Sequence, residues 1–425
     1  MNVGEILNGY EILAPIGEGG AGIVYDVLKD NVHYALKECV ELDYESLKRF
    51  SRELRIIKTL DTPNIVKVID DDLTYETPYY IMEKCDLSLE RAIKKGLNED
   101  QKYSFFLQAC KGFAELHNNG IVHRDIKPSN LLILNDVVKI SDFGLGKFEQ
   151  RDTTTITTEI TTKGTPGYMA PEILDEGQFK NADNRSDIFS IGVLLYFIFS
   201  DGMMPNPINP NSVPVEILYV VRKCMDAEPA KRYQHVEEII TDINIIINLS
   251  DELISMKALV TARKSITPID FSKRAFILML KSVDITELIN NIRTLTIEKL
   301  RYIANITPEY VQVLSKRIMD LCSEEEGQYG LQFSDVDLIV FACESLIYYD
   351  KDNQSVQELL GVSLSLSVNY NRWDCMRAFV RMVNSLDDDE VRYLTIFFVE
   401  HRDKMKVIQD SIDTKFNHVI TGLIS

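Results

Sequence analysis

Residues 123–130 read His-Arg-Asp-Ile-Lys-Pro-Ser-Asn, a short run that holds three side chains of complementary chemistry. Asp125 is a candidate general base, able to accept the proton of a hydroxyl and to orient that hydroxyl. Lys127 is a cation that can offset the charge of a phosphoryl group. Asn130 and the later Asp142 supply the oxygen ligands that Mg²⁺ prefers. This ordered set indicates phosphoryl transfer from a nucleotide to a hydroxyl.

A lone aspartate or asparagine in a loop is more often a turn residue than a catalytic one. Here, however, Ser-Asp-Phe-Gly at 141–144 and Met-Ala-Pro-Glu at 169–172 follow the first run in order. Because three such strings in this order are hard to obtain by chance, we favour the catalytic interpretation.

A glycine-rich segment lies upstream, with Gly17, Gly19 and Gly22 in G-x-G-x-x-G spacing. Glycines allow backbone N–H groups to close over phosphates without a Cβ in the way. The same spacing occurs in dinucleotide-binding folds, where a strand precedes it and a helix follows. The residues on both sides, 10–13 and 23–27, have strand character, which predicts a hairpin lid instead.

Lys37 ends the run Tyr-Ala-Leu-Lys in another predicted strand. A lone lysine at a strand edge is usually solvated. The stretch 45–60, however, has apolar residues at helical spacing, and Glu53 lies beside that apolar face. Its carboxylate can therefore point inward and hold Lys37 in place for the α- and β-phosphates of a nucleotide.

With these motifs, the segment from about Tyr10 to about Ile247 resembles a eukaryotic-type (Hanks-type) serine/threonine protein kinase. Cytosolic bacterial members with fused helical modules are the most similar. The resemblance implies an α+β bilobal fold: an antiparallel small lobe at about 1–84 and a helical large lobe at about 85–247. It also implies ATP in the cleft between the lobes, Mg²⁺, and a protein substrate.

The resemblance further implies where the nucleotide binds. Met82 matches the residue at the back of the adenine pocket, and Glu83 and Cys85 match the hinge that bonds the adenine. Residues of both lobes would contact the nucleotide: Gly17, Gly19, Gly22, Val24, Ala35, Lys37, Met82, Glu83, Cys85, Asp86 and Leu132.

Several supporting residues also match the family by position. Asp187 matches an aspartate that anchors the catalytic loop, and Arg232 matches the arginine that pairs with Glu172. Thr165 matches the threonine that bonds the catalytic aspartate and lysine in serine/threonine members. A stacked column of the active state is expected from Ile57, Val68, His123 and Phe143.

The segment between the glycines at 146 and 164 carries seven threonines. A polar, flexible loop would explain most of them. Arg124, beside the catalytic aspartate, is where a phosphothreonine would dock through charge-assisted hydrogen bonds. We therefore expect autophosphorylation, in cis or in a homodimer, with Thr161 as the first candidate and Thr162 as the second.

The chain departs from the family in two places. Residues 204–214 hold four prolines, so the helix that normally follows, often a docking surface for substrates, is expected to be truncated or replaced by a loop. Ser129 stands where many relatives have a glutamate, which weakens any case for basic substrate motifs.

Composition excludes several classes of protein. Lys plus Arg number 46 against 65 Asp plus Glu, a net charge of −19, which argues against binding nucleic acid or an anionic membrane. Seven unpatterned cysteines indicate reduced thiols rather than a disulfide framework or zinc site. The start of the chain lacks the features of a signal peptide, and the apolar run 188–200 is too short to span a bilayer. We therefore expect a cytoplasmic protein without a membrane partner.

Residues 248–425 show helical periodicity and no strand pattern, which predicts an all-α domain of antiparallel helix pairs, with a helical-repeat array as one candidate architecture. Helix starts are expected at Thr267 and Thr307, each followed by proline. Trp373 could belong to an exposed recognition patch, although core packing is favoured. The domain is expected to bind a regulator or a protein partner.

Two alternatives to an active serine/threonine kinase stay open. A pseudokinase scaffold would bind nucleotide and act through the helical domain, but it would require the loss of a functional residue. A small-molecule phosphotransferase of similar fold would usually lack the glycine lid and the Ala-Pro-Glu run, and both are present here.

Overall fold

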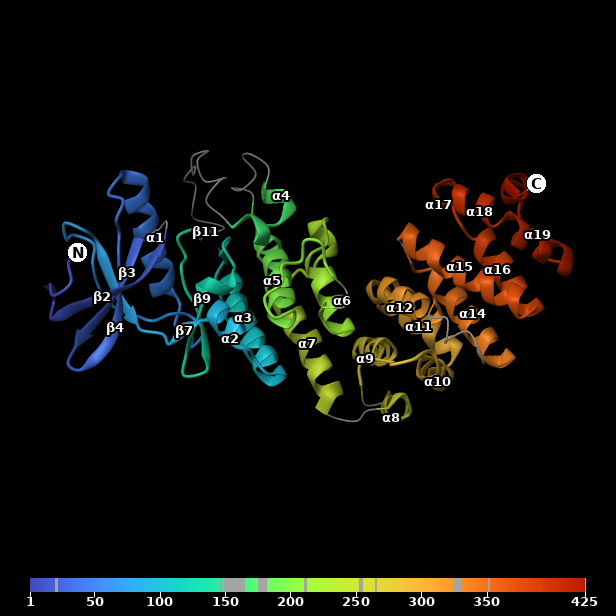
Figure 1. Cartoon of the computed structure of the whole chain (residues 1–425), viewed down its shortest axis with the longest axis horizontal. Helices are drawn as coiled ribbons and strands as arrows, with labels where there is room; N and C mark the ends of the chain where they lie inside the picture. Colours follow the sequence, from blue (N-terminus) through green and yellow to red (C-terminus); the bar gives the residue numbers. More distant parts are fainter. Residues whose placement is uncertain are drawn as a thin grey trace. The chain divides into compact units, whose positions relative to one another are not determined.

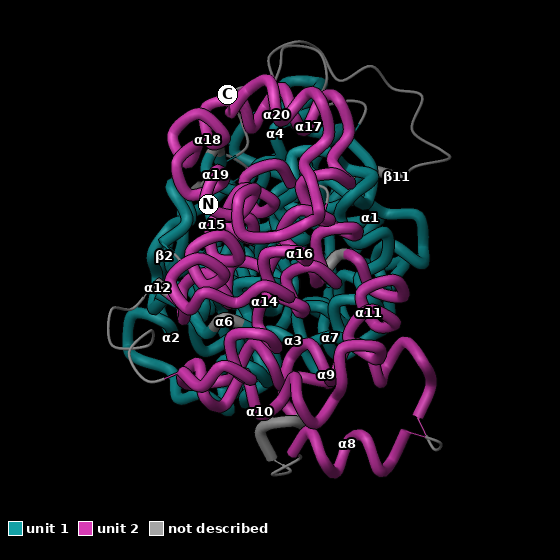
Figure 2. Tube along the Cα trace, turned by 90° about the vertical axis from the view of Figure 1, so that its right-hand side faces the viewer, with its two compact units in different colours: residues 1–244 teal, residues 245–425 magenta. Residues whose placement is uncertain are grey.

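The computed structural model describes the following residues: 1–19, 22–145, 147–148, 165–174, 182–209, 212–251, 255–263, 266–323, 331–350 and 352–424. The chain divides into two compact units, residues 1–244 and 245–425 (Figure 2). The predicted boundary after residue 247 lies three residues from this division, inside helix α7 (Val236–Asp251).

The first unit begins with a six-stranded antiparallel sheet in the order β1-β2-β3-β4-β6-β5. Its inward-facing residues include Ile12, Val27 and Leu36, which are fully buried. One helix, α1 (Tyr44–Thr59), accompanies the strands (Figure 1). The strands are β1 (Ile6–Leu7), β2 (Tyr10–Gly19), β3 (Gly22–Lys29), β4 (Val32–Glu38), β5 (Val68–Asp72) and β6 (Tyr79–Glu83).

Helix α1 forms where the apolar spacing predicts it. Asp43 caps its first turn by accepting hydrogen bonds from the backbone N–H groups of Glu45 and Ser46. Phe50 and Ile57 are buried on its inner face, together with Glu53. The helix therefore buries a carboxylate, Glu53, beside its apolar residues.

The rest of the first unit is mainly helical, and its centre is α5 (Asn184–Phe199). From Ser186 to Phe199 every residue of α5 is buried, in keeping with a sequence that is apolar except for Ser186, Asp187 and Ser190. The other elements are β7 (Leu87–Ser88), α2 (Leu89–Lys95), α3 (Glu99–Asn118), β8 (Ile121–Val122), η1 (Pro128–Asn130), β9 (Leu131–Leu134), β10 (Val137–Ile140), β11 (Lys147–Phe148), η3 (Pro166–Tyr168), α4 (Pro171–Leu174), α6 (Val215–Cys224) and η6 (Pro229–Lys231).

The second unit contains helices and no strand among its described residues. Helix α14 packs against α11, α15 and α16, and α12 packs against α15. The helices are α8 (Met256–Ala262), α9 (Pro268–Leu280), α10 (Ile285–Leu295), α11 (Ile297–Ile306), η8 (Pro308–Tyr310), α12 (Val311–Ser323), α14 (Phe333–Ile347), α15 (Asn353–Asn369), α16 (Trp373–Asn384), α17 (Asp388–Tyr393), α18 (Thr395–Glu400), α19 (Arg402–Ser411) and α20 (His418–Ile424). The predicted fold class, a bilobal α+β unit followed by an all-α region, is confirmed.

One expectation for the helical unit is wrong. Trp373 is 58% exposed, whereas Met376 and Phe379 on the same helix are buried, so core packing holds for these two neighbours and not for Trp373. The helix start expected at Thr307 is confirmed, since η8 begins at Pro308 and α12 follows it, but the Thr307 hydroxyl donates to the carbonyl of Ile303 and does not cap the new helix. Of the helices that the structure describes, none combines the length and apolar character that a bilayer span needs.

Candidate active site

One buried carboxylate, that of Asp187, holds the backbone of the catalytic loop. Asp187, on α5, accepts hydrogen bonds from the backbone N–H groups of His123 at 2.7 Å and Arg124 at 2.8 Å. It also bonds His117 Nε2 at 2.9 Å. Burial alone would raise the pKa of Asp187, but the bond to His117 and its neighbours outweigh burial and lower it. The loop is thus tied to the most buried helix of the unit.

Asp125 lies at the centre of a small polar network. Its carboxylate contacts Lys127 Nζ at 2.8 Å and accepts the Thr165 hydroxyl at 3.3 Å, and Lys127 Nζ also donates to that hydroxyl at 3.1 Å. Asn130 Nδ2 donates to the Asp125 carboxylate at 3.0 Å and to its backbone oxygen at 2.9 Å. The structure therefore brings together the four predicted residues of this group.

Lys37 is held by a second, buried group. Its Nζ lies 2.6 Å from Glu53 Oε1 and 3.4 Å from Asp142 Oδ1. Tyr80, which the sequence interpretation missed, donates its hydroxyl to Glu53 at 2.9 Å. Burial alone would lower the pKa of Lys37, but Asp142 and Glu53 outweigh it and raise the pKa well above its usual range. Lys37 is therefore a fixed cation directed at the cleft.

The pKa values of the two carboxyl groups beside Lys37, those of Glu53 and Asp142, shift in opposite directions. Burial raises the pKa of Glu53, although Lys37 opposes this effect. The charge of Lys37 lowers the pKa of Asp142, against the effect of burial. Asp142 also has a positive φ of 60°, which is uncommon for a residue with a side chain. Asp142 is thus an ionised carboxylate held in an unusual backbone conformation.

A cavity of about 660 Å³ opens between the lid, the hinge and the catalytic loop. Its size suits a nucleotide or a similar ligand. It is lined by most of the predicted nucleotide contacts: Gly17, Gly22, Val24, Ala35, Lys37, Met82, Glu83, Cys85, Asp86 and Leu132. Lys127, Asn130 and Asp142 line it as well, whereas Asp125 and Glu53 do not, so part of the predicted catalytic set shares one cavity with the predicted nucleotide residues.

Gly22 shows why the lid needs glycine. Its φ is +143°, and a Cβ at this position would lie 2.0 Å from the carbonyl oxygen of Glu38. Gly19 pairs with Gly22 across the β2–β3 ladder, as a hairpin requires. The glycine-rich segment therefore lies between two paired strands, as predicted for a hairpin lid, whereas a dinucleotide-binding fold would have a helix after it.

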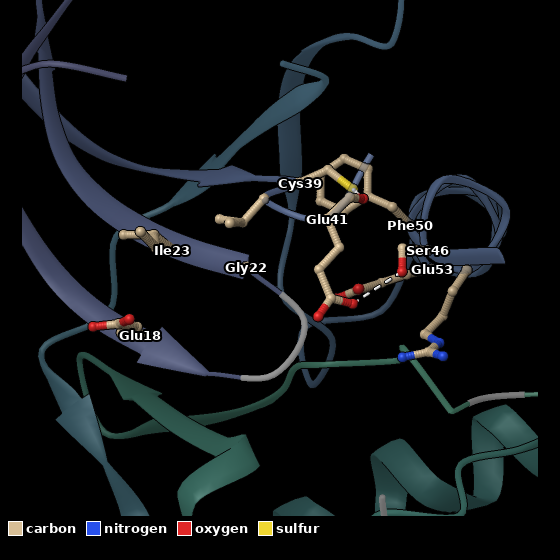
Figure 3. Close-up of a pocket in the computed structure, with 10 residues that line it drawn as sticks. Glu18, Gly22, Ile23, Cys39, Glu41, Ser46, Phe50 and Glu53 are labelled. Atoms are coloured by element: carbon tan, nitrogen blue, oxygen red, sulfur yellow. Dashed lines mark hydrogen bonds between the residues drawn. The ribbon is translucent and has the colours of Figure 1, made fainter. Parts of the chain in front are cut away.

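A smaller cavity of about 120 Å³ lies beside the lid, between β4 and α1 (Figure 3). Glu53 and Phe50 line it from α1, and Cys39 lines it from the end of β4. Ser46 Oγ donates to Glu41 at 3.0 Å across its rim, as the dashed line in the figure marks. Of the predicted catalytic residues, Glu53 lines this cavity, and Lys37, Asp125 and Lys127 do not.

The expected stacked column has buried rings at its base. Phe143 and His123 are fully buried, with their ring centroids 5.1 Å apart. Ile57 is 2% exposed, and Val68 is half-buried. The expected column therefore includes one ring contact, between His123 and Phe143, and a buried apolar residue of α1, Ile57.

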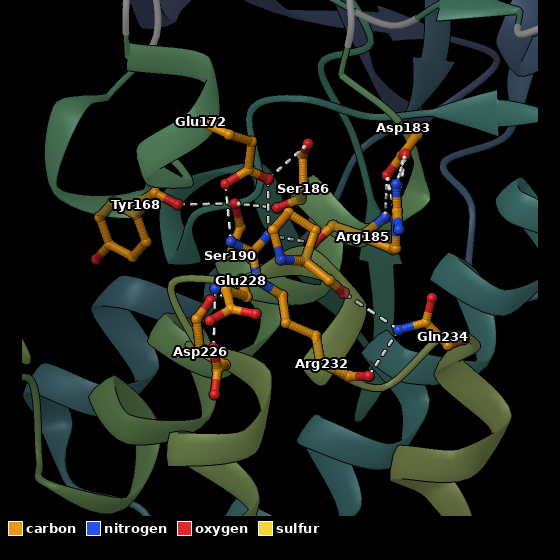
Figure 4. Close-up of polar contacts among 11 residues, drawn as sticks. Tyr168, Glu172, Asp183, Arg185, Ser186, Ser190, Asp226, Glu228, Arg232 and Gln234 are labelled. Atoms are coloured by element: carbon orange, nitrogen blue, oxygen red, sulfur yellow. Dashed lines mark hydrogen bonds and ion pairs between the residues drawn. The ribbon is translucent and has the colours of Figure 1, made fainter. Parts of the chain in front are cut away.

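A second, partly buried polar contact holds helix α4, through the ion pair of Glu172 with Arg232. Arg232 donates from Nη1 and Nη2 to the two carboxylate oxygens of Glu172, both at 2.7 Å (Figure 4). Ser186 Oγ also donates to Glu172, at 3.3 Å. Because Arg232 is only 2% exposed, loss of Glu172 would leave a buried charge unpaired.

Two groups of residues need separate comment. The candidate phosphosites Thr161 and Thr162 lie outside the described residues. Sequence interpretation also missed the hinge contacts of Glu83, whose carboxylate lies 2.8 Å from Lys139 Nζ and accepts the Lys67 N–H at 2.9 Å. No motif marks such a contact, because its partners are scattered along the chain.

Comparisons with known proteins agree with this geometry. The model of the protein kinase domain matches residues 10–291. A probable serine/threonine-protein kinase of Clostridium perfringens is 32% identical over 289 residues, covering 60% of this chain and 41% of that protein. One of Clostridium acetobutylicum is 30% identical over 280 residues, covering 58% of this chain and 41% of that protein.

The human tyrosine-protein kinase Fer is 33% identical over 242 residues, which is 51% of this chain and 29% of Fer. The matches thus include kinases named for either class of acceptor hydroxyl. The aligned part of this chain spans less than half the length of each of these relatives. Because the domain model covers well over half of this chain, the chain belongs to the protein kinase family.

Proposed function

We propose that this chain is a serine/threonine protein kinase, which transfers the γ-phosphoryl group of ATP to a hydroxyl of a protein substrate. The observation that carries the proposal is the contact of Asp125 and Lys127 with the single hydroxyl of Thr165. This arrangement joins the end of the activation segment to the base. The names of the two clostridial relatives support the same acceptor class.

Asp125 would act on the incoming hydroxyl. One of its carboxylate oxygens would accept the hydrogen bond of the substrate hydroxyl and orient it toward the γ-phosphorus. A bond forms between the substrate oxygen and phosphorus, while the bond from phosphorus to the β–γ bridging oxygen breaks. ADP leaves with that bonding pair, and the hydroxyl proton passes to Asp125. Lys127 Nζ, 2.8 Å from Asp125, would offset charge on the transferring group.

Lys37 would hold the donor nucleotide by its α- and β-phosphates. The bond to Glu53 at 2.6 Å fixes its direction, so little reorganisation is required when the phosphates arrive. Backbone groups of the lid would close over the same phosphates, as the hairpin at Gly22 allows.

The residues present fit Mg²⁺ at Asp142 and Asn130. The Asn130 amide nitrogen is used by Asp125, and its amide oxygen accepts no hydrogen bond from the described residues. Two protein oxygens suffice, because Mg²⁺ usually binds through one or two carboxylate or carbonyl groups, water and substrate phosphates. When bound, the ion would supply positive charge that neutralises the phosphate oxygens.

We also propose autophosphorylation at Thr161 or Thr162. The support is Arg124, whose backbone is held by Asp187 beside the base. The role of 248–425 as a regulatory or protein-binding domain is likewise a proposal, as is a cytoplasmic location. The latter is supported by the free state of all seven cysteines, Cys39, Cys85, Cys110, Cys224, Cys322, Cys343 and Cys375.

The test is mass spectrometry of the purified full chain after incubation with ATP and Mg²⁺, beside the Asp142→Ala variant. We expect new phosphate on the wild type alone, within residues 153–162. Thr161→Ala combined with Thr162→Ala should then lower activity toward a protein substrate. Absence of phosphate transfer to the chain itself and to generic protein substrates would contradict the proposed activity.

A further inference from the structure

Arg91 differs from the other cations that line the large cavity. The other three, Lys37, Lys84 and Lys127, each pair with a carboxylate, at N–O distances of 2.6, 2.7 and 2.8 Å. Arg91 is exposed and has no ion-pair partner among the residues that the structure describes. Its guanidinium is therefore available to an incoming ligand.

The position of Arg91 places it beside the catalytic loop. It lies in the first turn of α2, where Ser88 Oγ accepts its backbone N–H at 3.3 Å. Helix α2 packs against η1, the turn that directly follows Lys127. Ser129, in that turn, is exposed and lines the same cavity. This part of the rim therefore carries a cation and a neutral hydroxyl.

The acidic groups of the cavity do not cancel this charge. Glu90 is bonded by the lysine one turn further along α2, at 2.7 Å. Asp86 lies at the hinge and accepts the backbone N–H of Asn135 at 3.0 Å. Glu18 belongs to the lid, in the other lobe. Glu83 and Asp142 also line the cavity, and each is ion-paired, to Lys139 and Lys37 respectively. Among the described residues of α2 and η1 that line the cavity, the charge without an ion-pair partner is therefore positive.

We propose that Arg91 selects protein substrates that carry an acidic side chain close to the acceptor serine or threonine. The inference rests on the proposed function, because it takes Asp125 as the group that receives the substrate hydroxyl and Arg91 as a cation on the helix that packs against η1, beside the catalytic loop. A guanidinium presents paired N–H donors that match a carboxylate. Since Arg91 is exposed, the ion pair is expected to change kcat/KM by about fivefold.

The experiment uses the full chain and three synthetic peptides that share one threonine. Aspartate and glutamate flank the threonine in the first peptide, lysine and arginine in the second, and alanine in the third. The measured quantity is the ratio of kcat/KM for the acidic peptide to that for the basic peptide. The variants are Arg91→Glu and the milder Arg91→Gln. Lys95→Glu is the matched control, because Lys95 is exposed on the same helix and does not line the cavity.

We expect the wild type and Lys95→Glu to prefer the acidic peptide by about fivefold, Arg91→Gln to lose the preference, and Arg91→Glu to reverse it. Raising the salt concentration should reduce the wild-type preference. Equal use of the two charged peptides by the wild type would overturn the inference and leave the kinase activity standing. A shift in the ratio that is the same for Arg91→Glu and Lys95→Glu would also overturn it. Absence of transfer to all three peptides and to the chain itself would overturn the proposed function as well.

Discussion

Replacing Asp187 by asparagine tests how the catalytic loop is held. The carboxylate accepts three hydrogen bonds, from the backbone N–H groups of His123 and Arg124 and from His117 Nε2. Asparagine keeps the shape of the side chain but offers one oxygen. Its amide nitrogen must then face one of these donors. We therefore expect Asp187→Asn to destabilise the first unit and to weaken catalysis together.

The size of the effect follows from these bonds. A buried donor left without an acceptor costs about 1–3 kcal/mol. The remaining bonds lose the assistance of a full charge, which is worth about 1 kcal/mol each. Asp187→Asn should therefore lower the free energy of unfolding by about 3–5 kcal/mol. Because Asp187 is 1% exposed, water cannot replace the lost acceptor.

The matched control is Asp183→Asn at the start of the same helix. Asp183 is the N-cap of α5 and bonds Arg185, and its side chain is 39% exposed. Asparagine is also a good N-cap, so the cost should be at most about 1 kcal/mol. Urea unfolding of both variants, followed by circular dichroism and with wild type alongside, measures the difference. An Asp187→Asn variant that is no less stable than Asp183→Asn would refute the reasoning.

Three further predictions concern other groups. Lys37→Met should lower kcat/KM for ATP about 100-fold in a peptide phosphorylation assay, because it removes the buried cation that would hold the phosphates. An unchanged kcat together with an unchanged KM for ATP would contradict this prediction. Gly22→Ala should lower the melting temperature, since its Cβ would meet the Glu38 carbonyl, whereas Gly17→Ala meets only Val24 Cβ at 3.8 Å and should not. Burial raises the pKa of Asp350 to about 6, above its usual value of about 4, so the folded state binds more protons between these values and stability falls as pH rises through this window. Asp350→Asn should therefore lose this pH dependence in thermal melts, although its amide keeps only one of the bonds that the carboxylate accepts from Ser315 Oγ and the Asp352 N–H. An unchanged slope of melting temperature against pH between about pH 4 and pH 7 would exclude the mechanism.

The catalytic residues could be predicted from sequence because each lies in a short motif with fixed spacing. Asp125, Lys127 and Asn130 fall within six residues, and the structure places them in one hydrogen-bonded network. Tyr80 and His117 could not be predicted in the same way. Each is a single residue in an ordinary strand or helix, and its partner is 27 or 70 residues away. Long-range contacts of this kind depend on packing that no local pattern records.

The two Thr-Pro pairs of the helical unit show the same limit at the level of secondary structure. Thr267 caps α9 as its sequence predicts, by accepting the Asp270 N–H at 3.1 Å. Thr307 has the same following proline, but α11 ends directly before it, and its hydroxyl bonds the carbonyl of Ile303 instead. A threonine can serve either the helix before it or the helix after it. A helical segment still begins after Thr307, with η8 and then α12, so the Thr-Pro pair predicts the helix start in both places. The pair does not predict which backbone group the threonine hydroxyl bonds, because that depends on whether a preceding helix such as α11 reaches the threonine.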